Sequence, residues 1–469
     1  MERLRPSRLP TGVEGLDKVM CGGLQHPSSY LLAGGPGTGK TVLSSQIAFA
    51  LAKRHAKTMF VSVLTEPYSH LIRNLANLSF FDDHAINREL TFVSAYSILE
   101  AQGLQGMEEM LRLSLPQCGA QLVVLDNIGM LSGYASSLLE YRAFLQKIIA
   151  LSSMAGASLM ASTDRPFSSA ATEYGSFDWV IELKKRHFGL RTLRTLEVRK
   201  SRGSFALEGE HAFDIREAGL NIYPRLESGW LGAPQDRVWR ERLSWGIDGL
   251  GELAGGGVER GTVTGVVGPT GSGKTSLCIA FAAAALRAGE KVLYLTHHES
   301  PSRILEAARG LGIDLESGVR DGQLNLLWMP PEEASFERDV VAFFKWVEGR
   351  EPFRLIVDGL DAVRRVAVYP ERFSLMWRIA TDHLRGRGIT LLFVTEELPQ
   401  HGLHESHEIP WSNVENIFCL QDEVTNGQRI RFLRAVKTRG RQHDSAGRIL
   451  DISDRGVRLV PLPHSGRKR

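Results

Sequence analysis

Two short glycine-rich segments constrain this chain more than any other feature. Residues 34–41 read GGPGTGKT and residues 268–275 read GPTGSGKT, so both match the pattern G-x-x-x-x-G-K-[S/T]. Glycines at this spacing let the backbone wrap around phosphate groups with its N–H groups pointing inward. An apolar run precedes each segment, at 30–33 and at 263–267. Because a strand, such a loop and a helix together bind nucleotide phosphates, the sequence predicts two nucleotide sites.

The side chains of each loop have separate predicted roles. Lys40 and Lys274 are expected to reach the β- and γ-phosphates, while Thr41 and Thr275 are expected to hold Mg²⁺. The predicted nucleotide-binding residues are Gly35, Gly37, Thr38, Gly39, Lys40 and Thr41 in the first loop, and Gly271, Ser272, Gly273, Lys274 and Thr275 in the second.

The separation between the two loops recurs along the chain, which indicates an internal duplication. At this separation, R-L-x-x-G-V-x-G-L at 8–16 matches R-L-x-x-G-I-x-G-L at 242–250. After small drifts of the kind that loop insertions produce, K-S-R-G at 200–203 matches K-T-R-G at 437–440. We therefore predict two related domains, residues 1–225 and 241–462, with a linker at 226–240 and a basic tail at 463–469.

Short apolar runs alternate with amphipathic stretches in both halves. Near-continuous apolar runs of this length are typical of parallel strands that are buried on both faces. The pattern predicts an α/β class, in which two tandem P-loop domains have mainly parallel sheets flanked by helices. Strands are expected at 58–63, 122–125, 158–162 and 195–199, and at 292–296, 355–357, 390–394 and 431–436.

An aspartate ends one apolar run in each half. Asp126 follows the run at 122–125 and Asp358 follows the run at 355–357. Downstream of a P-loop, an aspartate in this place holds Mg²⁺ or a water bound to it. The alternative is an aspartate that only caps the next helix.

Composition excludes several classes of protein. Hydrophobic residues make up 43% of the chain and charged residues 23%, which is typical of a globular protein. The net charge of +3 is too small to indicate a nucleic-acid-binding surface. The four cysteines form no C-x-x-C pair, so we expect neither a zinc site nor a disulfide framework. Without a long apolar run or a signal peptide, we expect a cytoplasmic protein and no membrane partner.

Over nearly its whole length, the chain resembles the KaiC-type tandem ATPases of the RecA superfamily. The resemblance depends on the R-L-x-x-G motifs, both P-loops, both strands that end in aspartate and the K-x-R-G motifs. It also depends on the endings F-D-I at 213–215 and L-D-I at 450–452. The resemblance implies RecA-like domains, ATP and Mg²⁺ as ligands, and a ring-shaped homo-oligomer of six subunits.

The K-x-R-G motifs are the most specific part of the resemblance. In this family, the Lys and Arg of the motif reach the γ-phosphate of the neighbouring subunit, which implies such a role for Lys200, Arg202, Lys437 and Arg439. They would neutralise charge on the transferring phosphoryl group, and the head-to-tail contact that this requires can close into a ring. The alternative is a set of basic residues on the surface of an edge strand.

The chain departs from the family at the group that activates the attacking water. The family has two adjacent glutamates at the end of the second strand, and the first is the activating residue. In the first half, Glu66 comes one residue late, and one step along a strand reverses the side-chain direction. In the second half, His298 replaces the first glutamate and Glu299 retains the second. A histidine can act as a base, since its usual pKa is about 6.5. We therefore expect slow hydrolysis of ATP.

A second departure concerns phosphorylation. Clock proteins of this family have adjacent Ser and Thr residues before a late strand of the second domain. Trp411 and Ser412 occupy these positions here, so Ser412 is the best remaining acceptor for a serine/threonine autokinase.

Four functions follow from these patterns. The leading hypothesis is an oligomeric, slowly hydrolysing ATPase that acts as a nucleotide-driven switch, read by an unidentified signalling protein. An autokinase of circadian-clock type is the first alternative, and a nucleotide-gated scaffold with little catalysis is the second. A DNA-dependent RecA-like motor ranks last, because the loops at 164–173 and 396–401 are not basic.

Overall fold

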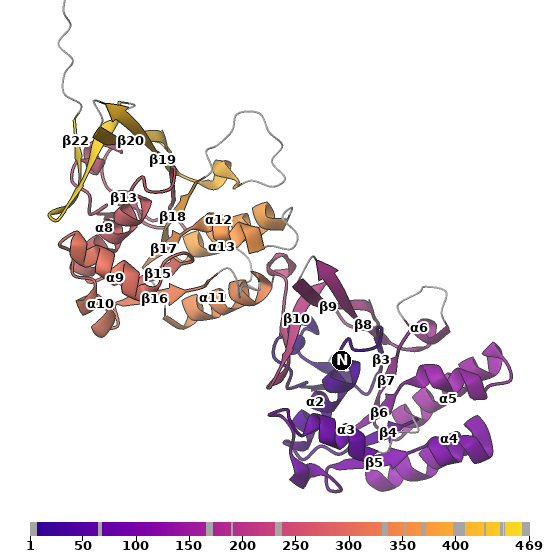
Figure 1. Cartoon of the computed structure of the whole chain (residues 1–469). Helices are drawn as coiled ribbons and strands as arrows, with labels where there is room; N and C mark the ends of the chain where they lie inside the picture. The colour runs from indigo at the N-terminus through magenta and orange to yellow at the C-terminus, as the bar shows by residue number, and fades with distance from the viewer. Residues whose placement is uncertain are drawn as a thin grey trace, which may run out of the picture. The chain divides into compact units, whose positions relative to one another are not determined.

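The computed structural model forms two compact units, Met1–Trp230 and Leu231–Arg469 (Figure 1). The structure describes residues 7–63, 68–165, 172–188, 191–229, 237–330, 336–350, 353–366, 372–396, 409–425, 428–440, 444 and 446–461.

A nine-stranded sheet forms the centre of the first unit, in the order β11-β10-β9-β8-β3-β7-β6-β4-β5. The strands from β8 to β5 are parallel, and β9, β10 and β11 extend the sheet in antiparallel fashion. The strands are β3 (Ser29–Ala33), β4 (Thr58–Ser62), β5 (Leu90–Ser94), β6 (Leu122–Asp126), β7 (Ser158–Thr163), β8 (Trp179–Phe188), β9 (Arg191–Ser201), β10 (His211–Arg216) and β11 (Gly219–Tyr223).

The second unit repeats this topology, in the order β16-β15-β17-β18-β14-β19-β20-β21-β22. Its strands are β14 (Val263–Val267), β15 (Val292–Thr296), β16 (Leu324–Trp328), β17 (Arg354–Asp358), β18 (Thr390–Thr395), β19 (Asn416–Thr425), β20 (Gln428–Thr438), β21 (Arg448–Ser453) and β22 (Gly456–Val460). The predicted fold class is confirmed: both units are RecA-like α/β domains with mainly parallel sheets.

Helices cover both faces of each sheet, which explains why the strands are apolar throughout (Figure 1). On β3, Leu31 and Ala33 pack in one core with residues of α4 (Tyr96–Cys118) and α5 (Leu138–Met154). Tyr30 and Leu32 pack in the other core with residues of α2 (Lys40–Ala52). The helices of the first unit are α2 (Lys40–Ala52), α3 (Tyr68–Leu75), α4 (Tyr96–Cys118), α5 (Leu138–Met154) and α6 (Thr172–Ser176).

In the second unit, α8 and α9 pack against one face of the sheet. Trp377 of α13 meets Phe393 of β18 edge-on, with ring centroids 5.1 Å apart. The helices are α8 (Lys274–Arg287), α9 (Pro301–Gly310), α10 (Glu316–Arg320), α11 (Phe336–Arg350), α12 (Leu360–Val366) and α13 (Phe373–Gly386).

The R-L-x-x-G motifs form a small substructure at the start of each unit. In the first unit it contains β1 (Ser7–Leu9), α1 (Leu16–Val19) and β2 (Leu24–His26), and in the second β12 (Arg242–Leu243), α7 (Leu250–Leu253) and β13 (Val258–Glu259). Gly15 has a φ of +81°, and a Cβ there would lie 1.9 Å from the carbonyl oxygen of Ile222. The motif requires glycine at this position because the backbone of β11 lies directly against it.

Residues on both sides of the boundary between the units are structured. Leu226 is buried within a 3₁₀ helix at Leu226–Ser228. Trp239 donates a hydrogen bond to the Arg385 carbonyl oxygen at 3.1 Å. The guanidinium of Arg260 lies 4.3 Å from the centroid of the Trp239 ring. Within the described part of the chain, no helix is long and apolar enough to cross a membrane.

Candidate nucleotide-binding sites

Each P-loop lies between the central parallel strand and the helix that follows it. Lys40 begins α2 and Lys274 begins α8, and each is preceded by a left-handed glycine. These glycines, Gly39 and Gly273, have φ values of +110° and +102°. The lysines and threonines of the loops therefore lie at the N-terminus of a helix, where backbone N–H groups attract anions.

In the first unit, the P-loop lysine is enclosed by its own loop and by one carboxylate. The Lys40 ammonium donates to the carbonyl oxygens of Gly34 at 2.7 Å and of Gly35 at 3.0 Å. It also forms an ion pair at 2.7 Å with Asp164, which directly follows β7. The ammonium thus points into the concave side of the loop, where phosphates would bind.

A hydroxyl and a carboxylate lie beside this lysine, at the place where a metal ion would bind. Thr41 Oγ1 is 3.2 Å from Asp126 Oδ2, and Ser162 Oγ donates to Asp126 Oδ1 at 2.6 Å. Thr41 and Asp126 border a cavity of about 310 Å³ that also contacts Ile215. A hydroxyl and a carboxylate next to a phosphate loop suit Mg²⁺, which takes one or two protein oxygens and fills its shell with phosphates and waters.

The second unit has the same lysine geometry with a looser ion pair. The Lys274 ammonium donates to the carbonyl oxygens of Gly268 at 2.6 Å and of Pro269 at 2.8 Å. Glu396 Oε1 is 4.0 Å from the ammonium and accepts a hydrogen bond from the Thr270 hydroxyl. Burial lowers the pKa of Lys274, and the carboxylate of Glu396 opposes this effect.

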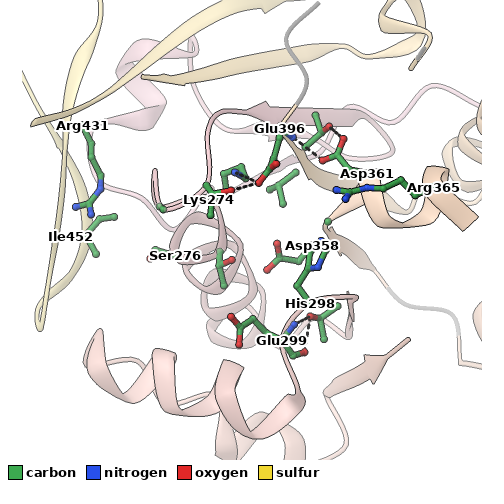
Figure 2. A pocket seen from close by; sticks show the side chains of 18 residues that line it. Lys274, Ser276, His298, Glu299, Asp358, Asp361, Arg365, Glu396, Arg431 and Ile452 are labelled. Carbon is green, nitrogen blue, oxygen red and sulfur yellow. Dashed lines mark hydrogen bonds and ion pairs between the residues drawn. The ribbon is translucent and has the colours of Figure 1, made fainter. Parts of the chain in front are cut away.

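Buried Asp361 holds the backbone that carries this glutamate. Its carboxylate accepts hydrogen bonds from Thr395 Oγ1 at 2.6 Å and from the backbone N–H of Glu396 at 2.8 Å. Figure 2 shows Asp361 and Glu396 on the same side of the pocket, above Lys274. The end of β18 is therefore anchored next to the P-loop.

The aspartate of the second site is more buried than that of the first. Asp358 is 8% exposed and accepts a hydrogen bond from the Tyr294 hydroxyl at 2.8 Å. Burial raises the pKa of Asp358, and hydrogen bonds from Tyr294 and Thr275 partly offset that rise. Thr275 and Asp358 thus adjoin each other in the way that Thr41 and Asp126 do. Among the described residues, no group of three metal-ligating acids, histidines or cysteines occurs.

The K-x-R-G motif of the first unit lies at the end of the sheet opposite its own P-loop. Lys200 of β9 pairs with Val180 at the start of β8, and Val180 pairs with Leu31 in the middle of β3. The Lys200 ammonium donates to the carbonyl oxygens of Tyr174 and Gly175 in α6 at 3.0 and 3.1 Å, and to that of Phe177, directly after α6, at 2.6 Å. The exposed Arg202 guanidinium lies 3.6 Å from Asp178.

The motif of the second unit has the same placement. Thr438 pairs with Asn416, which pairs with Thr264 at the start of β14. The Lys437 ammonium donates to the Trp411 carbonyl oxygen at 3.0 Å, and the Arg439 guanidinium lies 3.5 Å from Glu415. Since the P-loop follows the far end of the central strand, neither motif faces the nucleotide site of its own unit.

A sequence model of the family described as "ATPase: KaiC" matches residues 9–227 and 243–464. The chain belongs to the KaiC ATPase family. It is 27% identical to the circadian clock oscillator protein KaiC of Synechococcus elongatus, over 96% of this chain and 88% of the relative. The corresponding protein of Parathermosynechococcus lividus is 27% identical over 96% and 84%. The circadian clock protein KaiC2 of Synechocystis sp. is 27% identical over 97% and 81%.

Two of the candidate catalytic side chains of this KaiC-family chain border the second nucleotide site. His298 and Glu299 line a cavity of about 650 Å³ together with Lys274 and Asp358 (Figure 2). The imidazole of His298 lies against Gly359, where a Cβ would come within 2.9 Å of the ring. Glu299 Oε2 is 3.7 Å from the Arg303 guanidinium.

Other candidates lie elsewhere. Glu66 is outside the described residues, as are most of the loops at 164–173 and 396–401. Ser412 is exposed in a 3₁₀ helix at Trp411–Asn413, and its carbonyl oxygen is 3.5 Å from the Lys437 ammonium. Ser412 therefore lies at the same end of the sheet as the K-x-R-G motif.

Sequence reasoning missed several residues that border the sites. Asp164 and Glu396 approach the P-loop lysines. Each follows a predicted strand at the equivalent place in its repeat, and this equivalence could have identified both acids as site residues. Arg431 and Ile452 line the second cavity. Arg431 Nε is buried and has no hydrogen-bond partner among the described residues. Ile452 belongs to the L-D-I ending at 450–452, but that pattern does not indicate that it or Arg431 borders the site, because both come from antiparallel strands distant in sequence from the P-loop.

Proposed function

We propose that this KaiC-family chain is an ATP-binding, slowly hydrolysing ring ATPase that acts as a nucleotide-driven signalling switch. The observation that carries the proposal is that, within each unit, the P-loop lysine and the basic residues of the K-x-R-G motif lie far apart. Lys40 and Lys274 lie at the P-loops, whereas the K-x-R-G residues lie at the opposite end of each sheet. A complete site therefore needs the P-loop of one subunit and the K-x-R-G motif of the next.

This division of the site implies a head-to-tail assembly. Repeating the same contact closes into a ring, and the family resemblance implies six subunits. The exposed guanidinium groups of Arg202 and Arg439 would then neutralise charge on the phosphoryl group bound by the neighbouring P-loop. The subunit interface would also sense whether ATP or ADP is bound, which is the conformational signal that a partner protein would read.

At each site, the residues of the chain have defined tasks. Lys40 or Lys274 binds the terminal phosphates, and Thr41 with Asp126, or Thr275 with Asp358, holds Mg²⁺. When bound, Mg²⁺ neutralises the charge that develops on the phosphates. In the second unit, His298 and Glu299 lie where a water could be activated. We infer that turnover is slow, because a histidine replaces the water-activating glutamate of the family.

Ser412 supports a second candidate function, that of a serine/threonine autokinase. It is exposed beside Lys437, at the end of the sheet that would face the neighbouring nucleotide site. A phosphoryl acceptor in this place would be modified in trans. Intact-mass measurement after incubation with Mg-ATP, with Ser412→Ala as the control, tests this directly.

Phosphate release with Mg-ATP tests the leading proposal. Wild-type protein is expected to turn over slowly as an oligomer, and the combined Lys40→Ala and Lys274→Ala substitutions are expected to abolish turnover. The loss of phosphate release in each single variant measures how much of the turnover its own site contributes. Lys53→Ala, at the other end of α2, should leave the rate unchanged. Turnover that survives both P-loop substitutions would contradict the proposal, and so would a protein that stays monomeric with Mg-ATP.

A further inference from the structure

The two aspartates that we assign to Mg²⁺ are oriented by hydroxyl groups from different strands. In the first unit, Ser162 of β7 donates to Asp126 Oδ1 at 2.6 Å. In the second unit, the equivalent place in β18 is Val394, which has no hydroxyl. There, Tyr294 of β15 donates to Asp358 Oδ2 at 2.8 Å.

The exchange is reciprocal between the two units. The residue of the first unit equivalent to Tyr294 is Phe60 of β4, whose ring packs 5.4 Å from that of Phe92. Besides its contact with the P-loop threonine, each aspartate thus accepts a hydrogen bond from a strand hydroxyl, which belongs to β7 in the first site and to β15 in the second. We propose that Tyr294 is a positioning residue that orients Asp358 to hold Mg²⁺ in the second nucleotide site.

The surroundings of Tyr294 fit this role. Its side chain is fully buried, and its hydroxyl also contacts the Cys278 thiol of α8. A neutral phenol next to a carboxylate can only donate to it. The hydroxyl therefore connects the P-loop helix with the strand that ends in Asp358.

The hydrogen bond from Tyr294 to Asp358 should affect Mg²⁺ affinity, whereas general core packing affects the stability of the fold. A hydrogen bond to a metal-holding carboxylate fixes its orientation, and loss of such a partner typically lowers metal affinity by about 10- to 100-fold. Phe60 shows that a phenylalanine ring is accommodated at the equivalent place of the same fold. Removing the hydroxyl of Tyr294 should therefore weaken Mg²⁺ binding and leave the fold intact.

The inference depends on the proposed function, since it needs a second site that binds Mg-ATP. The test uses full-length protein with Lys40→Ala, so that the second site dominates binding. Binding of a fluorescent ATP analogue is measured at increasing Mg²⁺ and also with EDTA. With Tyr294→Phe, the Mg²⁺ concentration for half-maximal binding should rise by about 10- to 100-fold. Affinity in EDTA and the melting temperature without nucleotide should stay close to those of the Lys40→Ala parent.

A rescue variant separates positioning from packing. Adding Val394→Ser to Tyr294→Phe supplies a hydroxyl from β18, as Ser162 does from β7, and should restore most of the Mg²⁺ affinity. An unchanged Mg²⁺ requirement in Tyr294→Phe would overturn the inference, and so would an equal loss of binding with and without Mg²⁺. If the Lys40→Ala parent itself shows no Mg²⁺-dependent binding, the proposed function fails, which is a different result from a failure of Tyr294 alone.

Discussion

At the scale of single residues, each P-loop lysine has a carboxylate partner, which we expect to compete with phosphate. In the first unit this is Asp164, 2.7 Å from the Lys40 ammonium. Asp164 is partly exposed, so the ion pair contributes only about 0.2–1 kcal/mol. We expect Asp164→Asn to tighten ATP binding to the first site by up to about fivefold. Calorimetric titration of ATP in a Lys274→Ala background measures this.

The matched control is Asp83→Asn, which removes an exposed acid of the same unit far along the sequence from the P-loop. It should leave ATP affinity unchanged. Weaker ATP binding in Asp164→Asn would show that the carboxylate assists the nucleotide site instead of competing with it.

His297, the neighbour of the candidate base, gives the second unit a pH-dependent stability. Its Nδ1 is 2.9 Å from the Met329 carbonyl oxygen, and its Nε2 has no hydrogen-bond partner among the described residues. Burial lowers the pKa of His297 from 6.5, so the unfolded chain binds a proton more readily than the folded unit. The contribution of His297 to the free energy of unfolding should be constant above pH 6.5. Below that pH it should fall, by at most about 1.4 kcal/mol per pH unit.

Replacing this ring with His297→Gln should flatten the fall in melting temperature between pH 7.5 and 5.5. His70→Gln, at an exposed position of α3, serves as the control and should keep the wild-type slope. An unchanged slope in His297→Gln would mean that other groups cause the acid sensitivity.

Single-residue contacts also mark the limit of what the sequence predicted at the sites. The P-loops were recognisable because their spacing is local. Tyr294 and Asp361 were not, because they act through side-chain contacts with residues more distant in the chain. Tyr294 occupies an ordinary apolar strand position, and only the register of β15 with β17 brings its hydroxyl to Asp358.

At the scale of elements, Gly15 carries the contact between the small N-terminal helix α1 and the backbone of β11. A left-handed φ alone costs a non-glycine residue about 1–2 kcal/mol, and a Cβ at Gly15 would also clash with the Ile222 carbonyl oxygen at 1.9 Å. We expect Gly15→Ala to lower the free energy of unfolding of the first unit by clearly more than that. Chemical denaturation provides the measurement.

Gly119 offers a matched comparison, because its φ is +60° but a Cβ there would meet open space. Gly119→Ala should therefore show only the conformational cost. Equal effects of the two substitutions would argue against the close approach of α1 and β11.

Most strands were predictable because each is a short run that is apolar on both faces. The predicted strand at 292–296 coincides with β15, and the strand at 122–125 lacks only the last residue of β6. The hairpins were less predictable. β20 extends over Gln428–Thr438 rather than 431–436, because its polar outer residues are stabilised by pairing with β19 rather than by burial.

At the scale of the whole molecule, two units of one topology carry chemically different sites. The first site has Ser162 on its aspartate and an ion pair at 2.7 Å on its lysine. The second has Tyr294, His298 and a looser ion pair at 4.0 Å. The two repeats thus share the P-loop scaffold, while the side chains around it differ.

A mixing experiment tests whether each proposed nucleotide site is completed by a second subunit. One variant combines Lys40→Ala with Lys274→Ala, and the other combines Arg202→Ala with Arg439→Ala. Each alone should lose most of its phosphate release, because one lacks P-loop lysines and the other lacks the trans arginines. Mixed under conditions that allow subunit exchange, the two should regain a measurable rate, since intact P-loops then adjoin intact arginines. A mixture as inactive as its components, or full activity of the arginine variant alone, would contradict the completion of each site by a second subunit.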